Sequence, residues 1–366
     1  MSSSSTGQQL LINVFQCMMN NFPPSPRYYR VGWISAVQTE YVIACELLDE
    51  EFEERQLDLR HDNNLYTFGR IGQHNVVLAC LPKGKYGISS ATMVARDMCR
   101  SFSLCFLLMV GIGGGAPTKH NDVRLGDIVV SCPVAQSSGV IHYDSGAAIQ
   151  DKEFKRTGTL NAPPTSLLNA VQYLCSVHER RGHKITECIT KAITKNPRLK
   201  QKYERPLSGT DILYSSTFLH PDGDQPCAGL CDSVAANQVL RTQRDSPESE
   251  PVVHYGLIAS ADKLMKDAPL RDKLAKTERV LCFEMEGAGL MDAFPCLVIR
   301  GICDYSDTHK NDIWQGYAAA AAAAYARELL NVIPSSQVQP TPQTADNDTI
   351  LGIHNVLKPL ISEMTM

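Results

Sequence analysis

The sequence predicts a single α/β domain in which helices flank a mixed central sheet. Short apolar runs, some rich in Val and Ile, alternate along the chain with longer stretches of helical periodicity. The 366 residues are 43% hydrophobic and 20% charged, with 24 Gly and 20 Pro, which is the composition of a globular protein. Because buried strands read as continuous apolar runs and parallel strands are joined by helices, this order favours a sheet covered on both faces.

Seven apolar runs are the expected buried strands. They are residues 31–36, 76–81, 105–112, 127–131, 253–260, 280–283 and 296–302. Helical spacing appears at residues 40–51, 89–101, 165–177, 285–293 and 313–330. The last of these contains a run of alanines at 318–324, whose helix propensity and small side chains favour a closely packed helix.

Composition also divides the chain into a main domain and two flanking segments. Residues 1–27 are rich in Ser, Asn, Gln and Pro and predict a flexible leader, and residues 334–366 predict a linker with a short tail. The main domain is expected at residues 28–333. Within it, residues 175–206 carry nine basic and three acidic residues, a basic insertion that either forms a solvated helix face or meets phosphate groups.

The charge balance excludes several classes of partner. With 35 Lys and Arg against 39 Asp and Glu, the net charge of −4 attracts neither nucleic acid nor an anionic membrane, so we expect no partner of either kind. No apolar run reaches the roughly 20 residues that span a bilayer, and residues 1–9 lack the basic start of a signal peptide. The 13 cysteines are odd in number and several lie in apolar segments, so we expect free thiols and a cytoplasmic location.

Loops that follow the expected strands hold the candidate ligand contacts, because ligands of open α/β sheets bind at the carboxyl ends of strands. A glycine-rich turn begins at Gly111 and lets backbone approach a ligand closely. Glu284 and Glu286 end another strand, where a carboxylate either accepts hydrogen bonds from a sugar or caps a helix. Asp304 follows a third strand and is placed to act as a general acid. A fourth loop, at residues 34–40, joins the first strand to the first helix.

One further cluster concerns a metal. His220, Cys227, Cys231 and Asp232 lie close together in a segment rich in Gly and Pro. The Cys-x3-Cys spacing with a single upstream His is loose for a zinc site. We therefore expect a reaction that uses neither a metal nor another cofactor.

Seven motifs occur in the order typical of the purine nucleoside phosphorylase/uridine phosphorylase superfamily, and the chain resembles its nucleosidase branch over residues 28–332. The matching segments are residues 32–40, 84–87, 108–115, 125–131, 256–260, 283–286 and 298–304. The sequences of residues 66–72, 109–115 and 303–310 resemble those of a fungal group of these domains. That group often occurs at the N-terminus of NACHT-type immune receptors, and related domains act as ATP nucleosidases.

The resemblance implies a role for each loop in cleaving the N-glycosidic bond between ribose and a purine. In enzymes of the family, the Asp at the position of Asp304 protonates N7 of the purine, and the Glu at the position of Glu40 activates the attacking water. Glu286 is expected to bind the 2′- and 3′-hydroxyls of ribose, and Met285 to pack under the sugar.

The same resemblance implies the remaining contacts of the substrate. Leu264 and Met265 fall where nucleosidases contact the base, and Arg300 and Cys303 lie beside Asp304, with Cys303 replacing a more usual Ser. The other expected substrate-binding positions are Glu284, Gly111, Ile112 and Gly113.

Two positions favour water over phosphate as the nucleophile. Phosphorylases of the superfamily hold phosphate with an Arg that opens the central glycine loop, because an anion needs fixed positive charge. Met109 stands at that position, and Glu40 would repel an anion. Ile112 stands where relatives usually carry Ser or Thr, so contacts to the water or sugar are expected to differ there.

We therefore expect a purine N-ribosyl hydrolase, with a phosphorylase and a non-catalytic nucleoside-sensing domain as the alternatives. The partner is a small-molecule purine, either a nucleoside or a nucleotide such as ATP. A triphosphate would need cations near its 5′ end, which the basic insertion and nearby lysines could supply. The resemblance also implies a homo-oligomer.

Overall fold

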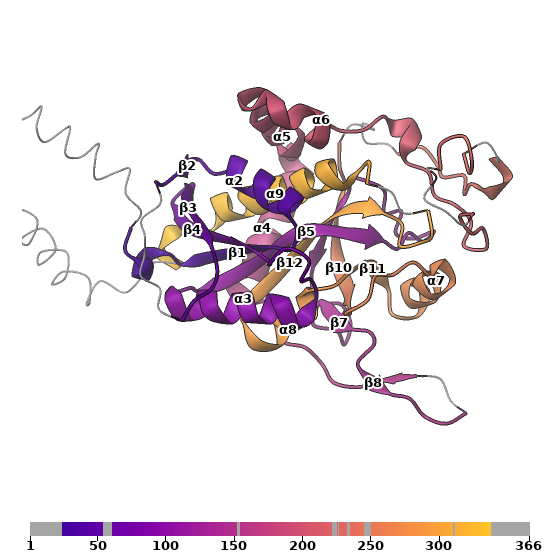
Figure 1. The fold of residues 1–366 in the computed structure, drawn as a ribbon, viewed down its shortest axis with the longest axis horizontal. Helices are drawn as coiled ribbons and strands as arrows, with labels where there is room; N and C mark the ends of the chain where they lie inside the picture. Colours follow the sequence, from indigo (N-terminus) through magenta and orange to yellow (C-terminus); the bar gives the residue numbers. More distant parts are fainter. Residues whose placement is uncertain are drawn as a thin grey trace, which may run out of the picture.

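The structure, a computed structural model, describes residues 24–53, 61–151, 154–221, 225, 227–232, 235–244, 250–309 and 312–337. One large sheet runs through the molecule with helices on both of its faces, which confirms the predicted fold class (Figure 1). The predicted leader and tail fall mostly on residues 1–23 and 338–366, which lie outside the described residues. The domain boundaries remain a prediction.

Ten strands form the large sheet. Nine of them follow the order β11-β10-β6-β12-β5-β1-β4-β3-β2, and β7 pairs with β10. Their bounds are β1 Val31–Ser35, β2 Glu50–Glu51, β3 Tyr66–Ile71, β4 His74–Cys80, β5 Phe106–Gly115, β6 Ile128–Ser131, β7 Val140–His142, β10 Val253–Ser260, β11 Val280–Glu284 and β12 Cys296–Asp304. A separate small sheet joins β8, Gly146–Ala147, to β9, Lys155–Arg156. All seven apolar runs are strands, and the central ones are buried, apart from a partly buried Ile112 in β5, because both faces of the sheet are covered.

The helices divide between the two faces of the sheet. Their bounds are α2 Gln38–Glu46, α3 Ile88–Ser101, α4 Thr165–Arg181, α5 Ile185–Lys195, α6 Lys200–Tyr203, α7 Ala268–Thr277, α8 Gly287–Ala293 and α9 Gln315–Val332. Short 3-10 helices occur at Pro26–Tyr28, Pro197–Leu199, Ser208–Thr210, Ala235–Asn237 and Ser335–Gln337. Helix α9 packs on β5 and β12 together with α2, α4, α5 and α6, and α3 and α8 pack together on the opposite face (Figure 1). In the described part of the chain, no helix is both long and apolar enough to cross a bilayer.

The alanine run explains how closely α9 approaches the sheet. All seven alanines are buried, and a Cβ added to Gly301 of β12 would overlap the carbonyl oxygen of Ala318. Small residues on both elements therefore allow backbone-to-backbone packing, as the composition of this helix predicts. This contact holds β12, the strand that ends at Asp304, against α9.

The glycine-rich motif differs from its prediction. Residues 111–115 form the last part of β5 instead of a loop. Strand β12 pairs with β5 in parallel as far as Gly114, and β11 pairs with it in the antiparallel direction at Gly114 and Gly115. Because partners lie on both sides, the backbone of this segment is held extended.

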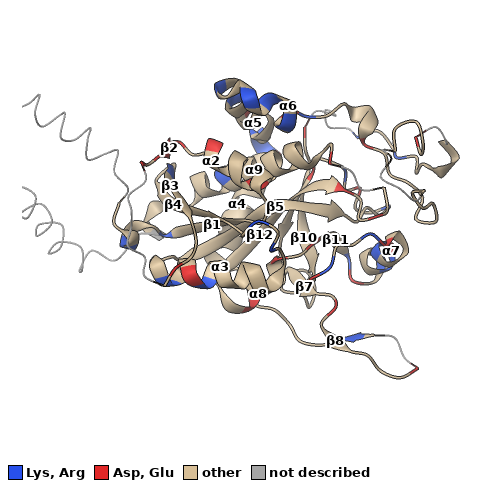
Figure 2. Cartoon of the chain, in the orientation of Figure 1, with Lys and Arg blue, Asp and Glu red and all other residues tan. Residues whose placement is uncertain are grey.

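The basic insertion forms the end of α4 and all of α5 and α6. Its lysines and arginines are exposed except Arg205, and Figure 2 shows the basic residues of α5 and α6 gathered at the outer edge of the molecule. Two lysines pair with nearby acids, Lys191 with Glu187 on α5 and Lys200 with Glu204 just after α6. The arrangement fits the solvated face, the first of the two interpretations of this segment.

Candidate active site

Glu40 is buried at the start of α2, with 3% of its surface exposed. Its Oε2 accepts hydrogen bonds from the backbone N–H groups of Ala36 at 2.6 Å and Val37 at 3.1 Å. Its Oε1 accepts from the N–H of Ile112 on β5 at 2.8 Å. Burial raises the pKa of Glu40, while Arg300 and the three N–H donors oppose that rise. The carboxylate therefore joins the first helix to the glycine-rich strand and has a pKa moved toward neutrality.

Arg300 of β12 is fully buried among three carboxylates. Its Nη2 forms a short ion pair with Oε2 of Glu284 and lies 3.3 Å from Oε2 of Glu286. A Cβ on Gly111 would meet Nη1 of Arg300 at 2.5 Å and would also overlap Oε1 of Glu40, so glycine is required where these two groups approach the strand. The carboxylates hold the pKa of Arg300 above its ordinary value.

Two donors of Arg300 lack protein acceptors among the described residues. Nε and Nη1 are buried, and no hydrogen-bond partner is found for either. Buried donors in proteins are paired in the great majority of cases, either with protein or with water. Nη1 of Arg300 and Oε1 of Glu40 both face Gly111. A polar ligand atom or a water beside this glycine would therefore give both groups a hydrogen-bond partner.

Glu286 and Glu284 differ in what they do, although the sequence places them two residues apart. Glu286 accepts a hydrogen bond from the N–H of Gly87 at 3.2 Å, which leaves Oε2 near Arg300. Glu284 accepts from the N–H groups of Glu286 at 3.0 Å and Gly287 at 2.8 Å in addition to its ion pair with Arg300. Its oxygens are thus committed to the turn before α8 and to Arg300. The structure places Glu284 as a support for the neighbouring side chains.

The pKa of Glu286 is raised to about 7. Burial is the main cause, and the nearby carboxylates of Glu284 and Glu40 add to the rise, while Arg300 and the N–H of Gly87 oppose it. At neutral pH this group is therefore close to its midpoint, and modest changes of pH alter its ability to accept hydrogen bonds.

Asp304 ends β12 beside Gly114 of β5. Its Oδ1 accepts the N–H of Ser306 at 2.8 Å, and the thiol of Cys303 donates to its Oδ2 at 3.2 Å. A Cβ on Gly114 would come within 2.6 Å of Oδ1, so this glycine leaves the space that the carboxyl group occupies. Ser306 has a φ of 54°, an unusual backbone conformation for a residue other than Gly, and its buried Oγ also faces Gly114.

The two candidate catalytic carboxyls contact different glycines of β5. Glu40 lies against Gly111 and Asp304 against Gly114, three residues further along the strand. Three residues of extended chain span roughly 10 Å. The backbone of β5 thus passes both carboxyl groups.

The expected base-contacting residues are placed differently from one another. Leu264 is about half exposed, whereas Met265 is buried in a small apolar cluster with Tyr143 and Phe283. Met285 is partly buried and its carbonyl oxygen lies 3.8 Å from where a Cβ on Gly87 would be. The structure thus brings Glu40, Glu284, Glu286 and Arg300 into one cluster, with Asp304 and Cys303 further along the same strands.

Two supporting residues were not predicted from sequence. Asp262 accepts the N–H of Ile88 at 2.7 Å and so caps α3 next to Gly87, the residue that binds Glu286. Ser260 accepts the N–H of Ala288 at 3.0 Å through its Oγ and holds the start of α8. Both lie at or just after the carboxyl end of β10, which is the only sequence feature that could have pointed to them.

A cavity of about 230 Å³ lies elsewhere, between the basic insertion and β6. None of Glu40, Glu286 and Asp304 lines it. Four arginines line this cavity, and three of them pair with acids: Arg124 with Asp122, Arg241 with Asp211 and Arg244 with Asp127; the fourth, Arg205, stacks over Trp314. Because these cations are already compensated or stacked, we place the candidate site at the buried carboxylates.

Comparison with known proteins gives the family. The sequence profile described as the phosphorylase superfamily matches residues 30–333. The chain is 40% identical over 348 residues to a nucleotide-binding leucine-rich repeat (NLR)-like protein of Hyaloscypha variabilis, covering 93% of this chain and 34% of that protein. It is 22% identical over 253 residues to the ATP nucleosidase Cap17 of Escherichia coli, covering 67% of this chain and 39% of that protein. The chain therefore spans little more than a third of the length of these curated relatives.

The fold has solved counterparts. The 5′-methylthioadenosine/S-adenosylhomocysteine nucleosidase of Helicobacter pylori superposes with a TM-score of 0.53 at 16% identity, covering 83% of this chain and 99% of the other. At this identity the likeness concerns the fold. The profile match over most of the chain shows that this protein belongs to the phosphorylase superfamily.

Proposed function

We propose that the protein is a purine N-ribosyl hydrolase, which cleaves the N-glycosidic bond of a purine nucleoside or nucleotide to give the free base and ribose or a ribose phosphate. The observation that carries this proposal is the position of Glu40. Its carboxylate is buried beside the glycine strand and shares the space at Gly111 with Nη1 of Arg300. A buried carboxylate with a raised pKa is suited to take a proton from water.

The negative charges around Glu40 and Arg300 disfavour phosphate as the nucleophile. Three carboxylates surround the single guanidinium of Arg300, which already pairs with Glu284. Met109, at the position where phosphorylases of the superfamily carry Arg, is fully buried in the core between β1 and β12. A dianion approaching this cluster would meet uncompensated negative charge.

The proposed reaction balances with water as the only co-reactant. The oxygen of water bonds to C1′ of ribose while Glu40 takes one of its protons. The bond between C1′ and the purine nitrogen breaks, its electron pair passes into the ring, and protonated Asp304 delivers a proton to N7. Glu286 accepts hydrogen bonds from the 2′- and 3′-hydroxyls, which holds the sugar as positive charge develops.

The cations best placed for a nucleotide are three lysines, and not the basic insertion. Lys83 and Lys85 precede Gly87, which binds Glu286, and Lys263 follows Asp262, which caps the same turn. All three lysines are exposed, and Lys263 also pairs with Asp144 at 3.7 Å. The similarity to an ATP nucleosidase supports a nucleotide as one of the two substrate classes.

Base release from a panel of purines tests this function. Adenosine, inosine, guanosine, 5′-methylthioadenosine and ATP are each incubated with the protein in buffer without phosphate, and free base is measured by chromatography. Release of base without phosphate supports hydrolysis, and the best substrate identifies the class. Release that requires phosphate, or no release from any substrate, contradicts the proposal and favours the phosphorylase or the sensing domain respectively.

A further inference from the structure

Between α6 and β10, the described residues form little regular structure. This segment is closed at its base by an isolated bridge between Tyr214 and Gln238. Beyond this bridge, the large apolar side chains of Leu219 and Leu230 are exposed. A bound metal adds stability to a segment with little regular structure.

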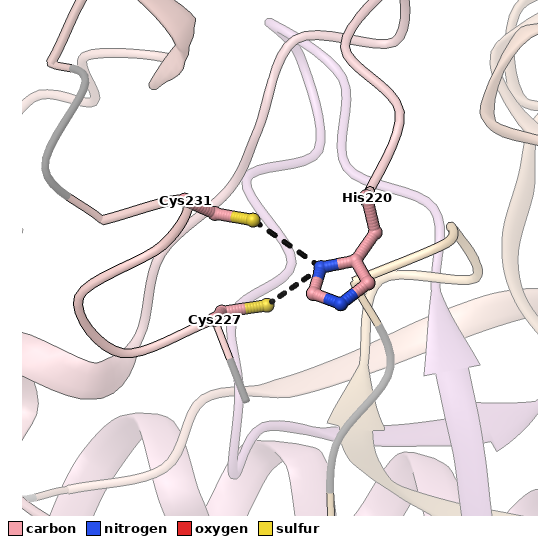
Figure 3. A group of neighbouring side chains, drawn as sticks. All are labelled: His220, Cys227 and Cys231. Atoms are coloured by element: carbon pink, nitrogen blue, oxygen red, sulfur yellow. Dashed lines mark hydrogen bonds between the residues drawn. The ribbon is translucent and has the colours of Figure 1, made fainter. Parts of the chain in front are cut away.

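Three metal-binding side chains converge beyond the bridge (Figure 3). Nδ1 of His220 lies 3.2 Å from Sγ of Cys231 and 3.5 Å from Sγ of Cys227. All three ligand atoms lie within 4.8 Å of one another. In a zinc tetrahedron with Zn–S of about 2.3 Å and Zn–N of about 2.0 Å, the N-to-S edge is about 3.5 Å. The observed distances are close to this edge.

The tautomer of His220 leaves its Nδ1 able to bind a metal. Nε2 of His220 lies 3.0 Å from the carbonyl oxygen of Gln225, and a carbonyl can only accept, so Nε2 carries the proton. In the neutral ring Nδ1 then has one lone pair, which can accept from a thiol or bind a metal, and the thiol of Cys227 also lies within reach of the carbonyl oxygen of His309. A metal ion bound to Nδ1 and to both sulfurs satisfies all three groups together.

The hydrogen bond of Nε2 is itself typical of a metal ligand. Histidines that bind a metal through one ring nitrogen commonly donate from the other to a carbonyl or carboxylate, which fixes the tautomer and the ring plane. Gln225 supplies such a carbonyl to His220. The Cys227 carbonyl accepts the N–H of Cys231 at 2.8 Å, so the turn that brings the two sulfurs together is also closed.

From these observations we infer that His220, Cys227 and Cys231 form a zinc site of the Cys2His type, with zinc as a structural ion. Two thiolates and an imidazole are the ligand set that zinc prefers among the common divalent metals. The described residues supply three ligands, and we assign no side chain to the fourth corner of the tetrahedron.

The site lies against the loop that follows Asp304. The N–H of His220 donates to Oγ1 of Thr308 at 2.9 Å, and Sγ of Cys227 lies 3.9 Å from the carbonyl oxygen of His309. The ring of His309 also stacks on Tyr214 at 4.0 Å between ring centroids. Zinc would therefore fasten this segment to the loop that begins at Asp304, and its effect on catalysis rests on the proposed function.

Metal content tests the site without reference to activity. The purified full chain is treated with a chelator, equilibrated with zinc, passed through a desalting column and analysed for zinc by mass spectrometry. We expect about one zinc per chain, and a zinc affinity lower by about tenfold or more in His220→Ala and in the double variant Cys227→Ala/Cys231→Ala. Cys99→Ala on α3, a partly buried cysteine far in sequence from the cluster, should bind zinc as the wild type does.

Two further measurements keep the inference testable if a variant folds poorly. Zinc added to the chelated wild-type protein should raise its thermal midpoint, and cobalt in place of zinc should give the absorption of thiolate-to-metal charge transfer. A wild-type chain without stoichiometric zinc, variants that bind zinc like the wild type, or a disulfide between Cys227 and Cys231 would overturn the inference. Zinc binding without base release would contradict only the proposed function.

Discussion

The carboxylate of Glu40 accepts the backbone N–H of Ile112 at 2.8 Å, a bond between residues 72 positions apart in the chain. It ties the start of α2 to the glycine strand β5 and fixes one oxygen of Glu40 beside Gly111. The second oxygen binds the turn before α2. A single side chain thus both stabilises the site and, in our proposal, activates the water.

Glu40→Gln separates these two roles. An amide oxygen directed at Ala36 and Val37 keeps two of the three hydrogen bonds, while the amide nitrogen facing the N–H of Ile112 loses the third. The lost bond should lower the free energy of unfolding by about 1–3 kcal/mol, which urea denaturation measures. Because the amide cannot accept a proton, base release should be abolished.

Binding distinguishes catalysis from folding in this variant. Free purine base, titrated by calorimetry, should bind Glu40→Gln nearly as well as it binds the wild type, since our proposal assigns the base to Asp304 and the water to Glu40. Wild-type turnover in the variant would remove Glu40 from the mechanism. A folded variant that has lost both turnover and binding would give Glu40 a binding role instead.

Asp304→Asn tests the proton donor. Asparagine can keep the hydrogen bond from the N–H of Ser306 through its oxygen, so the fold of the loop should survive. Since an amide cannot deliver the proton to N7, kcat should fall by about 10²- to 10⁴-fold with a smaller change in KM. Asp292→Asn, at an exposed position on α8, is the control and should match the wild type. An Asp304→Asn enzyme with unchanged kcat would exclude this residue as the acid.

Glu286 predicts opposite effects of pH on substrate binding and on stability. Its raised pKa of about 7 means that the carboxylate which accepts the ribose hydroxyls forms as pH rises through neutrality, so KM should fall between about pH 6 and about pH 8. The folded protein holds this proton over a range in which the unfolded chain, with a pKa near 4.5, has lost it. The stabilisation is therefore present below the unfolded pKa and is lost as pH rises through the folded pKa.

Urea unfolding at about pH 5 and about pH 8 measures the stability part of this prediction. In Glu286→Gln the decrease in unfolding free energy with pH should become smaller, because the titrating group is gone. Glu204→Gln, at an exposed site just after α6, should leave the decrease as it is in the wild type. A Glu286→Gln variant with the wild-type pH dependence would show that another group causes it.

Arg300→Met should destabilise the protein strongly. It leaves the buried carboxylates of Glu284 and Glu286 without their cation, and breaking a buried ion pair costs about 3–5 kcal/mol. Adding Glu284→Gln to Arg300→Met removes one of the uncompensated charges and should restore part of the stability. Arg327→Met, which breaks a partly exposed pair with Asp49, should cost about 1 kcal/mol or less. Equal losses in the two arginine variants would contradict the burial argument.

The fold was largely predictable because its strands are buried on both faces and read as continuous apolar runs. Strand β3, Tyr66–Ile71, was not predicted, since only its pairing with β4 across the turn at Gly72 reveals it as a hairpin partner. The glycines at 111–115 resemble a loop in sequence, and their strand conformation depends on pairing with β11 and β12. Long-range pairing of this kind leaves no local pattern.

The sequence predicted which residues form the candidate site better than it predicted what each of them does there. Glu284 and Glu286 are alike in sequence, and only the turn before α8 commits the oxygens of Glu284 to backbone N–H groups and Arg300. The charges of the basic insertion predicted either solvent or phosphate, and the packing of α5 and α6 on α9 directs them outward. His220 and the two cysteines have a loose spacing in sequence, yet the fold of their segment brings the three ligand atoms together.

The sugar product formed in the presence of saturating phosphate tests the central claim most directly. The enzyme is supplied with its best purine substrate and inorganic phosphate, and the sugar is identified by mass spectrometry after rapid quenching. If water is the nucleophile activated by Glu40, the sugar carries a hydroxyl on C1 and no added phosphate, and its rate of formation is independent of phosphate. A sugar bearing a new phosphate on C1 would contradict the account and identify the enzyme as a phosphorylase.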